Sequence, residues 1–191
     1  PTVARPGIRE MRTDSVRIAK EAQDAAKEVI LERWGKEYYP KKTRVFKTKS
    51  SAQDAHEAIR PVDVTILPDD IKPMLPPEQY RLYKLIWERF VASQMSEATF
   101  WDTVVTVKAD TGKTGITLWR VKGERLLFPG WMAATGTVTG KDSVELPKLA
   151  QGDALSLKEL GFEQKFTQPP PRYSEASLVK ELEEKGIGRP S

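Results

Sequence analysis

The chain has 191 residues, of which 39% are hydrophobic and 30% are charged, and its formal net charge is +4. This length suits one large domain or two small ones, and no apolar run approaches the roughly 18 residues that a membrane span needs. Because the chain has no cysteine, it can form neither disulfides nor a thiolate metal site, and we expect a cytoplasmic protein.

A first helix is predicted over residues 16 to about 34. Its apolar side chains recur at spacings of three and four, which places them on one helical face. Asp14 or Ser15 is the expected N-cap, because a short side-chain oxygen can accept from the free amides of the first turn. Gly35 is expected to end the helix.

The polar cluster ahead of this helix allows a second interpretation. Arg12 and Arg17 could hold a phosphate together with the helix N-terminus, since the guanidinium group matches phosphate oxygens in shape and charge. Simple capping with solvated arginines is the commoner arrangement, and both interpretations stay open on spacing alone.

The only histidine, His56, lies in "AQDAHEAIRP" at residues 52–61. The stretch predicts a short helix over 51–59 ahead of the proline, with His56 and Arg60 on one face and Glu57 off it. An imidazole can move a proton near a phosphate, although a lone histidine is more often a packed or surface residue. Without a second histidine or an acid cluster, we expect no self-contained metal site.

The positive charge is concentrated between Lys36 and Arg60, where seven basic residues face three acidic ones. Within this stretch, "KKTRVFKTK" at residues 41–49 holds five basic residues and no acid. Such a composition is expected where a loop follows a nucleic-acid backbone, with Lys47 and Lys49 as candidate contacts. A solvated loop is an equally good explanation, and salt-dependent DNA affinity separates the two.

A second helix is predicted by "PPEQYRLYKLIWERFVASQM", with proline in its first turn. From about Ser96 the pattern changes to strands over 100–110, 115–123 and 124–131, divided by "DTGKTG" and Gly123, and continuing through 154–160 and 163–168. Four tryptophans are expected in the core: Trp87, Trp101, Trp119 and Trp131.

The C-terminal stretch predicts a hinge at residues 169–171 and a capped helix in "SEASLVKELEEKGIG" that ends at Gly186. Arg189 and Ser191 follow as a phosphate contact or an exposed tail. Helices, then strands, then one helix favour an α+β fold: a helical subdomain, a mostly antiparallel β subdomain and a C-terminal helix.

Four motifs in one order carry a resemblance to a known family. "MRTDSVRI", "AQDAHEAIRP", "LYKLIWERFVASQM" and "PPPRYSEASLVKELEEKGIGRPS" resemble the central portion of a bacterial type IA DNA topoisomerase, from Met11 to Ser191. The resemblance implies a helical gate subdomain at 11–95, a β-rich arch subdomain at 96–168, and a hinge with the start of a helical base domain at 169–191. Residues 1–10 match poorly, and we expect an expression-vector remnant or a boundary there.

The resemblance also implies an activity. Family members relax negatively supercoiled DNA by transient single-strand cleavage through a 5′-phosphotyrosine link, strand passage and religation. The implied partners are single-stranded regions of DNA and the remainder of the topoisomerase chain, in the bacterial nucleoid and without a membrane. The implied cofactor is Mg²⁺, bound by an acidic toprim domain outside this chain.

Site roles follow from the matching positions. Arg12 would place and neutralise the scissile phosphate, and His56 would lie close to it. The candidate DNA contacts, which include the two basic-loop lysines, are Arg12, Thr13, Asp14, Lys47, Lys49, Arg60, Arg189 and Ser191.

One position departs from the family pattern. Glu10 stands directly before Met11, where the family has its nucleophilic tyrosine, and a carboxylate cannot form the stable phosphotyrosine ester. The chain as given is therefore predicted to be inactive. The alternative is a non-catalytic module that binds single-stranded nucleic acid, and a protein-interaction scaffold is a third possibility.

Overall fold

The computed structural model describes residues 7–9, 15–46, 57–112, 115–137 and 145–187. Two compact units divide the chain, Pro1–Leu146 and Pro147–Ser191. The first unit combines helices with antiparallel strand pairs, so the predicted α+β class is confirmed. No helix within the described residues is long and apolar enough to cross a membrane.

Helix α1 spans Lys20–Arg33 and buries Ala26, Val29 and Ile30. The predicted N-cap at Asp14 or Ser15 is wrong, because the cap position is Ala19 and no side chain caps the helix. Ser15 is instead buried, and its hydroxyl accepts from the Arg17 N–H at 3.2 Å. Gly35 ends the helix as predicted, with a φ of 95° and its N–H bonded to the last-turn carbonyls.

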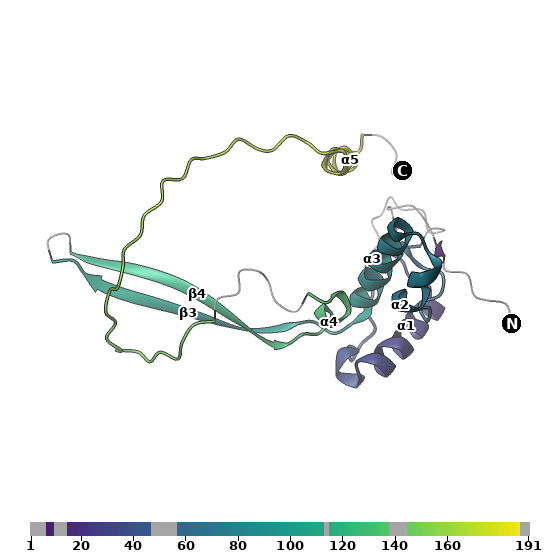
Figure 1. Ribbon diagram of the computed structural model, residues 1–191, viewed down its shortest axis with the longest axis horizontal. Coiled ribbons are helices and arrows are strands. Elements are labelled where there is room, and N and C mark those ends of the chain that lie inside the picture. Colours follow the sequence, from purple (N-terminus) through teal and green to yellow (C-terminus); the bar gives the residue numbers. More distant parts are fainter. Residues whose placement is uncertain (1–6, 10–14, 47–56, 113–114, 138–144, 188–191) are drawn as a thin grey trace. The chain divides into compact units, whose positions relative to one another are not determined.

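Helix α3 spans Pro77–Gln94 and confirms the second predicted helix, with Pro77 in its first turn. Figure 1 shows it beside α1 in the helical part of the first unit. Short helical segments complete this part: η1 at Lys36–Tyr38, α2 at Pro68–Ile71, η2 at Lys72–Met74 and α4 at Met132–Thr135.

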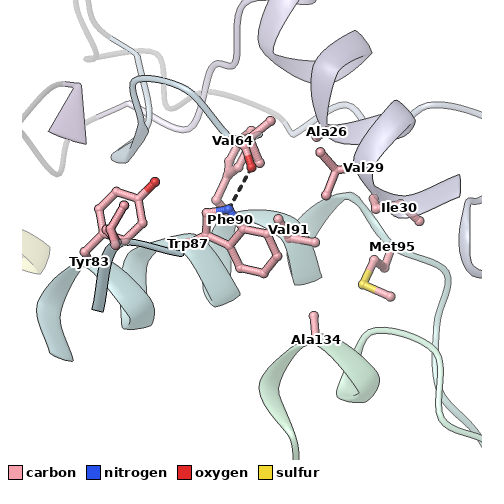
Figure 2. Close-up of a cluster of buried hydrophobic side chains, with 11 residues drawn as sticks. Ala26, Val29, Ile30, Val64, Tyr83, Trp87, Phe90, Val91, Met95 and Ala134 are labelled. Carbon is pink, nitrogen blue, oxygen red and sulfur yellow. Dashed lines mark hydrogen bonds between the residues drawn. The ribbon is translucent and has the colours of Figure 1, made fainter. Parts of the chain in front are cut away.

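The hydrophobic core lies between α1, α3, α4 and the loop before α2 (Figure 2). Trp87 confirms its predicted place there, being 4% exposed, and its indole Nε1–H donates to the Val64 carbonyl at 2.8 Å. The Tyr83 hydroxyl donates to the Ile66 carbonyl at 2.9 Å. Both bonds attach the polar ends of aromatic rings to the same loop, so the loop is held against α3.

Strands β3 (Thr99–Asp110) and β4 (Ile116–Phe128) form one long antiparallel ribbon (Figure 1). The predicted division at Gly123 is wrong, because Gly123 pairs with Thr103 inside an unbroken strand. The ribbon base is attached to the helical part by Ser96, whose N–H donates to the Tyr38 carbonyl at 2.8 Å and whose carbonyl accepts from Trp131 at 2.9 Å.

Three of the four tryptophans predicted in the core are exposed: Trp101, Trp119 and Trp131. The first two lie in the ribbon, where alternation correctly predicted strands. A two-stranded ribbon has two faces, and nothing among the described residues buries the face that carries these rings. Alternation therefore indicated the strands but not their burial.

Residues 147–187 of the second unit contain one helix, α5 at Glu175–Glu184. The strands predicted over 154–160 and 163–168 are wrong, since these residues are in neither a helix nor a strand and are exposed. The capped helix is confirmed: the Ser174 hydroxyl accepts from the Ser177 N–H at 3.2 Å, and Gly186 follows with a φ of 69°.

Candidate functional site

Two sequence motifs are brought together by a small strand pair. Strand β1 (Ile8–Arg9) pairs antiparallel with β2 (Arg60–Pro61), with Ile8 opposite Pro61 and Arg9 opposite Arg60. The Val62 N–H extends this pairing by donating to the Gly7 carbonyl at 2.9 Å. The chain entering residues 10–14 therefore lies against the chain that follows His56.

The other side of residues 10–14 is attached to the same segment. The Ala58 N–H donates to the Arg17 carbonyl at 2.7 Å, and Arg17 lies in the non-helical segment before α1. Both flanks of the polar motif are thus hydrogen-bonded to residues 58–62. This arrangement supports the hypothesis that the two motifs form one site.

Arg60 is a buried cation with a defined partner. It is 6% exposed, and its Nε and Nη2 groups both donate to Glu57 Oε2, at 3.0 and 2.8 Å. Its Nη1 group donates to the Pro61 carbonyl at 3.1 Å. The sequence pattern did not predict this ion pair, because Glu57 was placed off the helix face that His56 and Arg60 were expected to share.

That helix is wrong over the residues the structure describes, since residues 57–59 are not helical and Arg60 lies in β2. Arg60 therefore lies on no helix face, and His56 lies outside the described residues. A glutamate three residues before an arginine was the available signal for the ion pair.

A cavity of about 420 Å³ borders this ion pair, between the start of α1 and residues 57–64. Among the described residues that line it are three acidic ones, Glu21, Glu57 and Asp63, and one basic one, Arg60. The described part of this lining is therefore unfavourable for a phosphate group.

The basic loop serves two purposes in its described part. Arg44 is structural, because its Nε donates to the Met95 carbonyl at 3.0 Å and its Nη2 lies 3.4 Å from Glu97 Oε1. Lys41 is exposed and borders, with Lys27, Lys36 and Tyr39, an open groove of about 1040 Å³. Lysines beside an aromatic ring suit a nucleic-acid strand.

Most predicted site residues lie outside the described residues, so their roles stay predictions. They are Glu10, Arg12, Thr13, Asp14, Lys47, Lys49, His56, Arg189 and Ser191. Within the described part of the chain, no group of three or more metal-ligating side chains is present.

Comparison with known proteins gives consistent matches. A family model described as DNA topoisomerase matches residues 9–191. DNA topoisomerase 1 of Helicobacter pylori is 46% identical over 182 residues, which are 95% of this chain and 24% of that protein. DNA topoisomerase 1 of Vibrio cholerae is 44% identical over 181 residues, 95% of this chain and 20% of that protein.

A solved structure agrees with these relatives. Full-length topoisomerase I from Thermotoga maritima superposes with a TM-score of 0.70 at 32% sequence identity, covering 96% of this chain and 28% of that one. The chain thus spans about a quarter of the length of the relatives it matches.

Proposed function

Since this chain belongs to the bacterial type IA DNA topoisomerases, we propose that it is the gate-and-arch portion of an enzyme that relaxes negatively supercoiled DNA. The proposed reaction cleaves one strand through a 5′-phosphotyrosine link, passes another strand and reseals the break. Residues 11–95 would form the gate, 96–168 the arch, and 169–191 the hinge and the start of a base domain.

The observation that supports this proposal most is the attachment of both flanks of residues 10–14 to residues 58–62. A cleavage site needs its phosphate-binding and proton-transferring groups in one place before the substrate arrives. In the proposed site, Arg12 neutralises the scissile phosphate and His56 lies near it. Thr13 and Asp14 would contact the same DNA segment.

The other proposed contacts concern the DNA strand away from the break. Lys47 and Lys49 continue the basic loop, whose described part borders the groove with Tyr39. Arg189 and Ser191 follow α5 in the second unit. We propose that these four residues bind single-stranded DNA. The affinity would fall as the salt concentration rises, because the lysine and arginine contacts neutralise phosphate groups.

The metal ion is proposed to act outside this chain. Type IA chemistry implies Mg²⁺, and within the described residues no group of three or more His, Cys, Asp or Glu side chains could hold a metal ion. The proposed reaction therefore assigns no step to a metal ion bound by the described residues. We propose a cytoplasmic, nucleoid-associated enzyme.

Glu10 supports the alternative, a non-catalytic module that binds single-stranded nucleic acid. The two proposals differ in a plasmid relaxation experiment with the full-length protein encoded by the parent gene. The topoisomerase proposal expects relaxation of a negatively supercoiled plasmid by that protein and none by the 191-residue chain. Binding without relaxation by the full-length protein would favour the module.

A further inference from the structure

Arg60 is a candidate DNA contact by position, but its geometry points to another role. Building on the proposed topoisomerase function, we propose that Glu57 and Arg60 are a positioning pair. Their ion pair fixes the turn between them, and that turn holds both flanks of residues 10–14 in register with the chain that follows His56. Neither side chain touches DNA in this proposal.

The side chains of Glu57 and Arg60 bridge the two ends of the turn. Two nitrogens of the Arg60 guanidinium donate to one Glu57 oxygen, and the third donates to the Pro61 carbonyl. Three of the five arginine N–H donors are therefore engaged within residues 57–61. A rigid planar fork held in this way fixes the backbone between the two residues more firmly than a flexible lysine could.

The same backbone carries the attachments to the polar motif. Ala58, inside the turn, donates to Arg17, and Arg60 pairs with Arg9 in β1. These positions bracket residues 10–14 on both sides. A change in the shape of the turn would thus reach both ends of the motif, through the 2.7 Å bond from Ala58 to Arg17 and the strand pairing that the 2.9 Å bond from Val62 to Gly7 extends.

Burial and charge argue against a phosphate on Arg60. The side chains of Arg60 and Glu57 are only 7% and 13% exposed. The adjoining cavity also presents Glu21 and Asp63, so a phosphate approaching through it meets like charge. DNA would have to displace Glu57 from a partly desolvated ion pair to reach the guanidinium.

The test uses the full-length enzyme and compares Glu57→Gln, Arg60→Gln and the double variant with wild type. DNA cleavage rate and affinity for a single-stranded oligonucleotide are measured across a salt series. We expect each single variant to lose cleavage by about 100-fold through misplacement of the motif, at unchanged affinity and salt dependence. The double variant should lose no more than the worse single one, because the pair acts as a unit.

Two further variants keep the result interpretable. Arg60→Lys retains the positive charge and replaces Arg60→Gln in the comparison if that variant fails to fold. Arg60→Lys should also lose cleavage activity while its affinity for the oligonucleotide is unchanged. Glu88→Gln removes the carboxylate of an ion pair on α3, 3.6 Å from Lys84, and should behave as wild type.

A direct phosphate contact predicts the opposite pattern. Arg60→Gln would then weaken binding and lower the salt slope by about 0.7, Arg60→Lys would retain cleavage, and Glu57→Gln would leave it intact. That pattern overturns the positioning role while leaving the topoisomerase proposal standing. A wild-type enzyme that never cleaves DNA would instead overturn both.

Discussion

Single residues decide how the two motifs meet. The residue types of "MRTDS" and "AHEAIR" indicated a phosphate site from the sequence alone, because arginine and histidine suit that chemistry. The ion pair of Glu57 with Arg60 was missed although a spacing of three residues suits such a pair, and the turn that joins the two residues lies where the sequence pattern favoured a helix. The phosphate site thus stays a prediction from residue identity, while the contacts of the fold show that Arg60 is engaged by Glu57.

Replacing Arg12 with alanine in the full-length enzyme should lower the rate of DNA cleavage by about 100-fold. The reason is that an arginine beside the scissile phosphate acts mainly on charge that develops during the reaction. Affinity for a single-stranded oligonucleotide should fall far less. Equal losses in cleavage and binding would mean that Arg12 only holds the DNA.

Tyr83 should make the stability of the fold pH-dependent in the alkaline range. Burial, with the nearby Asp63 carboxylate adding to it, raises the pKa of Tyr83 from 10.0 to about 12. The unfolded chain therefore deprotonates this phenol first, so the stability it contributes is complete below pH 10 and is lost as the pH rises toward 12.

Tyr83→Phe isolates this contribution. At neutral pH the variant should be less stable by about 1 kcal/mol, because the Ile66 carbonyl loses its donor. Urea denaturation at neutral pH and at about pH 11 should show the gap between wild type and variant shrinking at the higher pH. A gap that stays constant would contradict the raised pKa.

Among the helices and strands, the sequence predicted an element correctly where capping or terminating residues mark its ends. Helix α3 begins at Pro77, and α5 has its cap at Ser174 and its stop at Gly186. The strands predicted over 154–160 and 163–168 did not form. Alternation of apolar and polar residues shows that a segment is able to pair, but a strand also needs a partner strand to pair with. Gly123 was misread since a glycine within a strand looks the same in sequence as one that ends it.

Gly130 fixes the return of the ribbon to the helical part. Its φ is 48°, and a Cβ there would overlap the backbone of Glu97 and Ala98 at the start of the ribbon. Gly130→Ala should destabilise the fold by about 2–4 kcal/mol through this overlap and the backbone strain. Thermal denaturation measures the change.

Gly136→Ala is the matched control for that substitution. Gly136 also has a positive φ, of 67°, but open space surrounds the added methyl group. Gly136→Ala should lower the free energy of unfolding by only about 1 kcal/mol, because of backbone strain. Similar losses in the two variants would show that close approach at Gly130 is unimportant.

For the whole molecule, the core of the first unit should carry the stability. The described residues 147–187 include no buried side chain, whereas the first unit buries a cluster around Trp87, Phe90 and Val91. A chain truncated after Leu146 should therefore keep the denaturation midpoint of the full 191 residues, because every residue of the hydrophobic core cluster lies before Leu146. A clearly lower midpoint would mean that the second unit stabilises the first.

The residue at position 10 decides whether a phosphotyrosyl link can form. A 3′-labelled single-stranded oligonucleotide, Mg²⁺ and a denaturing gel detect a 5′-phosphotyrosyl adduct, and mass spectrometry locates the modified residue. We predict that the full-length protein encoded by the parent gene forms this adduct on a tyrosine directly before Met11, and that the chain bearing Glu10 forms none. An adduct on the Glu10 chain, or one from the full-length protein on a different residue, would contradict the account.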